Sequence, residues 1–454
     1  MCVLKHTHML LTHQYRIQPS IAQQAQMNWW CELLRRHHNY ALGQRLDWLR
    51  RTRCLADRCS LISEPMGEIP GASPNYYLQA GELKQTKVLF PDYRNIYHDV
   101  QQQNLKRLEK AWERWVKPDN SGRRGGRPRF KKKGELRSFT FPRVNSEKAG
   151  ANIRGGLLTL SKIGSMPIIL HRPLLDGFTL KTCTIVKQAD GWYASISLED
   201  QTVPALIPLD NIKSAVGVDV GLKEFLTTSD GETEPVQQNF RRDQKRLARH
   251  QRRSCRMQKG SNNAQKQKNR VARIHQRIKR QRKEFHYKVA HKLVKAYDLI
   301  GVEDLNIKGL ARTKLAKSIL DAAWGEFLTI LEAVAVKRGV RVVKVKPHGT
   351  TADCSTCGWK VPKTLEIRTH DCPKCLTVLD RDLNAAINIL VRAIQAVGLT
   401  VSACGGLLSW VTRHADHLVK SVEARSVGGG SFPRRTSSGM SSCEIGSPDY
   451  TACG

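Results

Sequence analysis

The six residues Ala215-Val-Gly-Val-Asp-Val220 place one carboxylate inside an otherwise apolar run. A short Val-rich run of this kind predicts a buried β-strand. An ionised group is costly in such a strand unless cations or hydrogen-bond donors satisfy it, so Asp219 is a candidate functional residue. Two later features predict more of the same sheet, namely a hairpin turn at Ser229-Asp-Gly231 and an apolar strand from Leu299 to Glu303.

A helix and a further strand are expected after Glu303. Apolar residues recur at helical spacing from Ile319 to Val334, which predicts one amphipathic helix. Gly339 is expected to end this helix, and Val340 to Val345 to form a strand. The order hairpin, helices, strand, helix, strand indicates a mixed sheet flanked by helices.

The region before this sheet has a different pattern. Short alternating runs fill Phe139 to Leu198, with a turn at Ala189-Asp-Gly191, and they predict a small antiparallel β domain. Tyr15-Arg-Ile17 is expected to be an early strand of the same barrel. The helices predicted at 21–49 and 93–116 would then be an insertion in that barrel.

Composition narrows the class of protein. The chain has 454 residues, of which 40% are hydrophobic and 25% charged, so it is neither one small binding module nor disordered throughout. No apolar run approaches the roughly 18 residues that span a bilayer, and the short apolar N-terminal run is no signal-peptide core. We therefore expect a soluble protein of the cytoplasm with no membrane partner and with reduced cysteines. Past residue 396 periodicity is lost, and 396–454 is expected to be a flexible tail.

Positive charge is large and clustered. The 75 Lys and Arg exceed the 40 Asp and Glu by 35. Between Arg241 and Lys288 there are 19 basic residues against two acids, and the spacing predicts two basic helices around a turn at Gly260-Ser-Asn-Asn263. A second basic cluster, Arg123 to Arg137, contains Gly and Pro and is expected to be a loop. Such a surplus favours a polyanionic partner, and nucleic acid is the leading candidate over a merely solvated surface.

Two CxxC pairs predict a metal site. Cys354 and Cys357 are separated by 14 residues from Cys372 and Cys375, close to the spacing of zinc ribbons. Four thiolates complete a tetrahedron, so the zinc would be structural rather than catalytic. The alternative is that these are two chance pairs of buried free thiols.

Three carboxylates lie at the ends of predicted elements: Asp219, Glu303 and Asp382, the last at the start of an apolar helix. If they converge on one sheet edge, they could hold two Mg²⁺ ions and support phosphodiester hydrolysis. Taken singly, each has an ordinary interpretation as a turn, surface or helix-dipole charge. Spacing alone leaves both interpretations open.

These residues resemble a known family. The segments Val216-Gly-Val-Asp-Val-Gly-Leu-Lys223, Gly301-Val-Glu-Asp-Leu-Asn306 and Asp380-Arg-Asp-Leu-Asn384, with the CxxC pairs before the last, are similar to the three RuvC motifs and zinc ribbon of TnpB, a transposon-encoded RNA-guided DNA endonuclease related to type V CRISPR effectors. The resemblance covers roughly residues 12 to 392 and includes Gly126-Arg-Pro-Arg-Phe-Lys-Lys-Lys133.

The resemblance implies a multidomain α+β fold, with an RNase H-like (RuvC) mixed sheet that contains the zinc ribbon, and a β-barrel wedge domain with a helical recognition insertion. We expect the corresponding boundaries at 1–135 (N-terminal strand and recognition helices), 136–205 (wedge barrel), 206–395 (nuclease domain), 238–292 (basic helical insertion) and 348–380 (zinc ribbon). It also implies that Asp219, Glu303 and Asp382 are the catalytic, Mg²⁺-binding acids, and that the four cysteines hold zinc.

The resemblance further implies two partners: a guide RNA from the element's end and double-stranded target DNA. In such systems base pairing reads the sequence while the protein contacts the backbone. Phosphate contacts are expected from the two basic clusters, specifically from Arg127, Arg129, Lys131, Lys132, Arg242, Arg246, Arg253, Arg273 and Arg277.

Three functions follow from these observations. The first is an RNA-guided, Mg²⁺-dependent DNA endonuclease of a transposable element. The second is an RNA-guided DNA-binding protein that does not cleave, although such a protein would not need the three acids. The third is a transposase or recombinase that works without a guide, although no clear recognition-helix motif is present.

Overall fold

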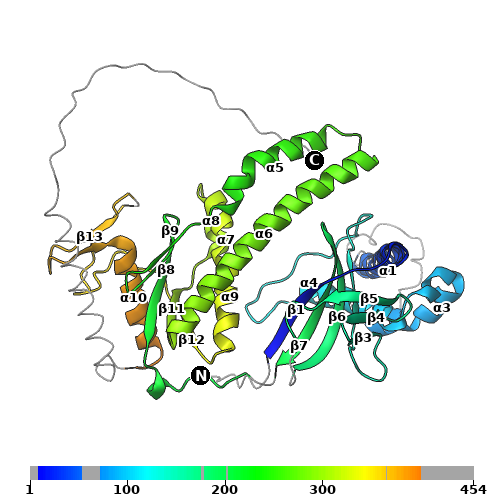
Figure 1. Cartoon of the computed structure of the whole chain (residues 1–454), viewed down its shortest axis with the longest axis horizontal. Coiled ribbons are helices and arrows are strands. Elements are labelled where there is room, and N and C mark those ends of the chain that lie inside the picture. Colours follow the sequence, from blue (N-terminus) through cyan, green and yellow to red (C-terminus); the bar gives the residue numbers. More distant parts are fainter. Residues whose placement is uncertain (1–8, 54–71, 175–177, 201–202, 365, 400–454) are drawn as a thin grey trace, which may run out of the picture. The chain divides into compact units, whose positions relative to one another are not determined.

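The computed structural model describes residues 9–53, 72–174, 178–200, 203–364 and 366–399 (Figure 1). From residue 400 on, the expected tail lies outside the described residues. The chain divides into two compact units: one comprises Met1–Ile212, Pro235–Ile300 and Asn306–Val342, the other Lys213–Glu234, Gly301–Leu305 and Val343–Gly454. No helix of the described residues is long and apolar enough to cross a membrane.

The first unit contains a seven-stranded antiparallel sheet. Its strands are β1 (Met9–Ile17), β2 (Ser138–Phe141), β3 (Ala151–Arg154), β4 (Leu157–Leu160), β5 (Gly164–Ile169), β6 (Phe178–Gln188) and β7 (Gly191–Asp200). They are ordered β2-β6-β7-β1-β5-β4-β3. A bridge between Val144, just after β2, and Ala151 in β3 links the two edges, so the sheet is nearly closed. The expected early strand is confirmed, because β1 pairs with β7 and β5.

Helices separate β1 from β2 in the chain, as expected for an insertion. They are α1 (Ile21–Arg53), α2 (Tyr76–Gly81), α3 (Leu83–Leu89), the 3-10 helix η2 (Pro91–Asn95) and α4 (His98–Val116). Trp30 of α1 is fully buried, and its ring centroid lies 5.4 Å from that of Phe139 in β2. The start of α1 therefore shares the hydrophobic core of the sheet. The helices also bury a smaller cluster of their own, made of Ala41, Leu42, Leu83, Leu105 and Leu108.

The two basic helices are also present. They are α5 (Asn239–Cys255) and α6 (Asn262–Ala296), which lie side by side (Figure 1). A thin apolar stripe of Leu247, Ile274 and Ile278 is buried between them. The Ser261 side chain accepts a hydrogen bond from the amide of Ala264, which caps the start of α6. The C-terminal part of α6 buries Val289, Ala290, Leu293 and Val294 and packs against α9 (Trp324–Val336), while Lys and Arg side chains cover much of the remaining surface of both helices.

The single helix expected from Ile319 to Val334 is wrong. Instead α8 (Ala316–Ala322) and α9 (Trp324–Val336) are separated at Ala323, which has a left-handed φ of 52°. The break frees the Ala322 carbonyl, which accepts a hydrogen bond from His286 Nε2 at 3.0 Å. It also places Asp321 at the start of α5, where its carboxylate accepts from the amide of Phe240 at 2.9 Å. Tertiary hydrogen bonds thus override the apolar periodicity.

A second, five-stranded sheet has the order β10-β9-β8-β11-β12. Its strands are β8 (Ala215–Val220), β9 (Glu224–Thr228), β10 (Thr233–Pro235), β11 (Leu299–Glu303) and β12 (Arg341–Val345). β8 and β9 are antiparallel. Backbone hydrogen bonds join the start of β12 to the start of β11 and the end to the end, so these two are parallel. The expected mixed sheet is confirmed.

The remaining elements are short, except for the last helix. They are η3 (Leu209–Asn211), α7 (Ile307–Leu310), β13 (Thr369–Asp371), β14 (Val378–Asp380) and α10 (Arg381–Ala396). The antiparallel pair β13 and β14 leads directly into α10. Within the second unit α10 packs against β8.

Two glycines allow this close packing. A Cβ added to Gly217 of β8 would lie 2.0 Å from the carbonyl oxygen of Ala386 in α10. A Cβ added to Gly301 of β11 would lie 2.7 Å from the Cβ of Ala393. Both distances are far below van der Waals contact, so the backbone of α10 can approach the strands only where a side chain is missing.

We therefore expect Gly217→Ala to destabilise the fold by about 3 kcal/mol, the upper end of the usual cost of overpacking, because the clash is with backbone that cannot rotate away. The measurement is thermal unfolding of the full chain. Gly81→Ala in α2 is the matched control, because a Cβ there meets nothing within 4 Å. An unchanged melting temperature for the Gly217 variant would contradict the packing described here.

Candidate metal centres and nucleic-acid surface

The four predicted zinc ligands come together. The sulfur atoms of Cys354, Cys357, Cys372 and Cys375 all lie within 4.8 Å of one another. The Sγ atoms of Cys354 and Cys375 are 3.6 Å apart, as are those of Cys357 and Cys372. Both short pairs join one CxxC knuckle to the other. Tetrahedral zinc with bonds of about 2.3 Å sets its sulfurs roughly 3.8 Å apart, so the cluster fits a structural Zn²⁺.

Local hydrogen bonds shape each knuckle. The amide of Cys354 donates to the carbonyl of Trp359, and that of Cys372 to the carbonyl of Thr377. The Thr377 hydroxyl lies 3.2 Å from the sulfur of Cys375, and hydrogen bonds from this hydroxyl and from the backbone lower the pKa of Cys375 to about 6. That thiol is therefore readily ionised, as a metal ligand must be.

The knuckles are fixed to α10 by two asparagines. The Asn384 amide oxygen accepts from the Ser355 amide at 3.0 Å, and its nitrogen donates to the Asp353 carbonyl at 2.9 Å. Asn388 donates to the carbonyls of Thr350 and Asp353. The segment that carries the cysteine knuckles is thus joined by hydrogen bonds to α10, the helix in which Asp382 lies.

The three predicted acids lie at the ends of elements of the second unit, as expected. Asp219 is the last but one residue of β8, Glu303 is the last of β11, and Asp382 is the second of α10. Burial raises the pKa of Asp219 well above its usual range, and the nearby charges of Glu303 and Asp382 raise it further. Arg381 acts in the opposite direction. Carboxylates that affect one another in this way share a neighbourhood.

The acids are less tightly grouped than the cysteines. Among the described residues, the four-cysteine cluster is the only set of potential ligands whose atoms all lie within 4.8 Å of one another.

Supporting residues that the sequence did not reveal surround the acids. The Thr350 hydroxyl donates to Glu303 Oε1 at 2.5 Å. Burial raises the pKa of Glu303, while this hydrogen bond and the charge of Arg392 oppose the rise. Arg381 Nε donates to Asp382 Oδ1 at 3.2 Å. No sequence pattern marks Thr350 as a partner of Glu303, since 47 positions separate them.

The predicted phosphate contacts fall into two groups. In the loop cluster, the Arg127 guanidinium lies over the Trp115 ring at 5.8 Å, and the Lys131 backbone is bonded to Asn39 of α1. Burial lowers the pKa of the Lys131 amine. Arg129 and Lys132 are exposed. The loop itself has no helix or strand, as expected, but it is anchored on α1.

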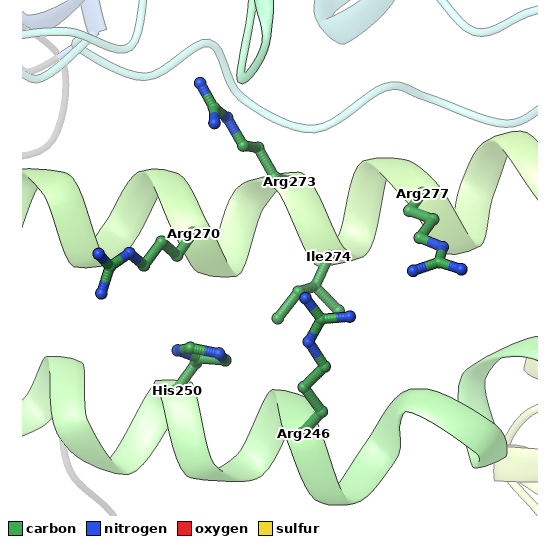
Figure 2. Close-up of a pocket in the computed structure, with 6 residues that line it drawn as sticks. All are labelled: Arg246, His250, Arg270, Arg273, Ile274 and Arg277. Atoms are coloured by element: carbon green, nitrogen blue, oxygen red, sulfur yellow. The ribbon is translucent and has the colours of Figure 1, made fainter.

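In the basic helices the structure brings only some of the predicted residues together. Arg246, Arg273 and Arg277 line one cleft between α5 and α6, together with Arg270 and His250, which the sequence did not single out (Figure 2). Arg242 instead donates to Asn239, and Arg253 is exposed elsewhere on α5.

Comparison with known proteins assigns the class. A family model described as a probable transposase (OrfB_IS605) matches residues 195–314, and the Cas12f1-like TNB domain matches residues 324–389. A Streptomyces pristinaespiralis protein named "Putative RNA-guided DNA endonuclease" is 35% identical over 67% of this chain and 72% of its own length. An Escherichia coli K12 protein with the same name and the suffix InsQ is 32% identical over 68% of this chain and 76% of its own.

More distant likenesses agree in kind. A mimivirus protein named TnpB-like protein L79 is 30% identical over 41% of this chain and 39% of its own length. A solved Cas12f1–sgRNA–target DNA complex overlaps 84% of this chain and 99% of its own with 12% identity, but its TM-score of 0.41 is too low to assign a fold. The sequence relatives are sufficient: the chain belongs to the TnpB family.

We expect Cys354→Ser to lose bound zinc and to unfold the ribbon, because the free energy of metal binding is folding free energy here, about 10 kcal/mol or more for structural zinc. Zinc analysis of the purified chain and thermal unfolding measure this. Cys255→Ser, at an exposed thiol, is the matched control. If the wild-type protein contains no zinc and melts at the same temperature as the Cys354→Ser variant, the assignment of a structural zinc site is refuted.

We expect Asp219→Asn to stabilise the fold at neutral pH in buffer without added Mg²⁺. The unfolded carboxyl ionises near 3.8 and the folded one at higher pH, so the folded state holds more protons in between and stability falls as pH rises through that window. Thermal melts at neutral and acidic pH test this, since the advantage of Asn should shrink as pH falls toward 3.8. A variant less stable than wild type at neutral pH would contradict it.

Proposed function

We propose that this protein is an RNA-guided DNA endonuclease of a transposable element, with an RNase H-like (RuvC) nuclease site formed by Asp219, Glu303 and Asp382. The observation that carries the proposal is the position of three acids at the ends of β8, β11 and α10, where Glu303 and Asp382 lie close enough to raise the pKa of Asp219, in a chain with a net charge of +35. The names of the family relatives support the guide RNA and the DNA substrate. The alternative surface or turn roles for these acids do not account for the burial of Asp219 close to the charges of Glu303 and Asp382.

The acids suit Mg²⁺, which prefers carboxylate oxygens. Burial and like charge make Asp219 costly to ionise, so a dication that shares the site would relieve an unfavourable interaction already present. When bound there, Mg²⁺ supplies an activated water and charge stabilisation for the leaving oxygen of a phosphodiester. The cysteine cluster, with four protein ligands, is suited to structural Zn²⁺ and not to this chemistry.

The chain's own residues orient the acids. Asp380 caps α10 by accepting hydrogen bonds from the amides of Asp382 and Leu383, which fixes where Asp382 emerges. Thr350 holds one oxygen of Glu303 and leaves the other carboxylate oxygen for a ligand. Asp219 accepts a hydrogen bond from the backbone of Val220, a weak compensation for its burial. Together these bonds reduce the reorganisation needed when substrate binds.

The remaining parts of the chain would hold nucleic acid. We assign the barrel with its inserted helices (1–135 and 136–205) to a wedge and recognition role, and α5 with α6 to backbone contact, within a nuclease region of 206–395. The positive charge on α5 and α6 suits phosphates without selecting a sequence. Base pairing with a guide would then supply the sequence selection.

A second function has one specific observation in its favour. An Allomeiothermus silvanus relative is named CRISPR-associated DNA-binding protein Cas12m and is 33% identical over 26% of this chain and 24% of its own length. Its name describes binding rather than cleavage. A guided protein that binds target DNA without cutting it is therefore the alternative that a cleavage assay must exclude.

We expect Asp219→Ala, Glu303→Gln and Asp382→Asn each to lower the rate of DNA cleavage by at least about 100-fold, because each removes an oxygen ligand or negative charge from the site. The measurement is cleavage of plasmid DNA by the protein–RNA complex, with DNA binding followed in parallel. Asp304→Asn is the matched control, because this acid is exposed and adjacent to Glu303. DNA cleavage that persists in the Asp219→Ala variant would rule out these three acids as the nuclease site.

Sequencing of the RNA that co-purifies from the native locus tests the guide. One structured species with a variable 3′ end supports an RNA-guided enzyme. Random fragments, with DNA processing retained, would favour a guide-free transposase or recombinase. If one RNA species is present and DNA is bound but never cut, the non-cleaving function is correct.

A further inference from the structure

A cleft between α5 and α6 has a chemistry that no comparison assigns. Its volume is about 400 Å³. Figure 2 shows Arg246 and His250 of α5 pointing toward α6, and Arg270 and Arg277 of α6 pointing toward α5. Ile274 lies between them, buried to 5% exposure. The cleft therefore has an apolar floor with cationic groups along both sides.

Arg273 lines the same cleft but is already engaged. Its Nε donates to the carbonyl of Ala189 in the β6–β7 turn at 3.2 Å, and Figure 2 shows it pointing away from α5. Three guanidinium groups, those of Arg246, Arg270 and Arg277, remain directed into the cleft. The acid nearest to them in sequence, Asp243, lies 4.0 Å from Arg246 and does not line the cleft.

The ring of His250 is held in one tautomer. Gln267 Nε2 donates to the His250 carbonyl at 2.9 Å, which fixes the orientation of the Gln267 amide because a carbonyl only accepts. The same Nε2 lies 3.0 Å from His250 Nδ1, so Nδ1 must accept and carries no proton. The ring proton of neutral His250 is therefore on Nε2, which is a donor.

The polar side chains directed into the cleft consequently offer only donors. Arginine has no acceptor, and the acceptor of His250 is taken by Gln267. Apart from the O6 and N7 acceptors of guanine, base edges also present amino groups, which need acceptors, whereas a phosphate needs donors alone. Three guanidinium charges also favour an anionic phosphate over a neutral base. A divalent cation is excluded by the charge of three guanidiniums.

We propose that this cleft binds a single phosphodiester group of a nucleic-acid strand and does not read its bases. A neighbouring hollow of about 220 Å³, lined by Lys266, Asn269, Arg270 and Arg273, continues the basic surface along α6. That continuation favours a strand over a free phosphate ion. The proposal deepens the proposed function and rests on it only in taking nucleic acid as the ligand.

The test is the salt dependence of binding by the full chain, with a mixed-sequence RNA and a duplex DNA of equal length as probes. Each lost phosphate contact lowers the slope of log K against log salt by about 0.7 for a single strand and about 0.9 for a duplex. If Arg246 and Arg277 share one phosphate, Arg246→Gln, Arg277→Gln and the double variant all lose about one contact. The probe that shows this pattern identifies the source of the phosphate.

The matched control is the double variant Arg252→Gln/Lys279→Gln, which removes two exposed cations outside the cleft. If the cleft binds one phosphate, each single cleft variant changes the salt slope, and the double variant changes it no further. A double cleft variant that loses twice as much as each single one would show separate phosphates and overturn the proposal. So would a control that loses as much as the cleft variants with both probes.

His250 and its positioning residue Gln267 provide a second measurement. We expect His250→Ala and Gln267→Leu each to weaken binding roughly tenfold, the effect of one charge-assisted hydrogen bond, and the double variant to be no weaker than either. Additive losses would show that Gln267 acts independently of His250. Both measurements report nucleic-acid binding, so they do not depend on whether the three acids support cleavage. Variants that cleave DNA normally and show unchanged salt slopes would reject phosphate binding by the cleft and leave the proposed endonuclease function standing.

Discussion

The second unit depends on how closely α10 approaches the strands β8 and β11. Gly217 and Gly301 remove the side chains that would keep the helix away. In each strand the glycine precedes the acid by two residues, so both lie on the same face, toward α10. Two residues of strand advance about 6.6 Å and four residues of helix about 6 Å, so a helix seated with Ala386 over Gly217 brings Asp382 level with Asp219. Backbone packing thus sets the spacing of the acids.

The segment around the four-cysteine cluster also holds α10 and Glu303 in place. Its first knuckle is bonded to Asn384 and Asn388 of α10, and Thr350, just before the knuckle, is bonded to Glu303. Burying Asp219 near two other acids is unfavourable, and these contacts together with the core beneath α10 offset that free energy. The cysteines and the acids, which look like separate motifs in the sequence, are linked by hydrogen bonds through α10 and Thr350.

Much of this could be predicted from residues alone, and the exceptions have physical reasons. Periodicity located the strands around Asp219 and Glu303, and the CxxC spacing identified the cysteine cluster, because both depend on local sequence. Apolar periodicity did not predict the helix break at Ala323, because hydrogen bonds of His286 and Asp321 with other elements stabilise the broken form. The hydrogen bonds of Thr350 to Glu303 and of Arg273 to Ala189 could not be predicted either, since each joins residues that are distant in the chain. The sequence alone could not show that the three acids lie near one another, because this depends on how α10 packs on the strands. The repeated pattern of Gly, Val and an acid does, however, mark where that packing occurs.

The place of β1 in the first sheet has a consequence for how the protein is made. This strand precedes every other strand of its sheet in the chain, and it pairs along its whole length with β7, where Met9 is opposite Asp200. Its other neighbour is β5, so no partner strand is available until β5 is synthesised, and the full pairing must wait for β7. The nascent chain must therefore keep an unpaired strand of Met9–Ile17 in solution while the inserted helices emerge, which delays sheet formation and exposes a strand edge to other chains. Slow translation before residue 200 would prolong that exposure.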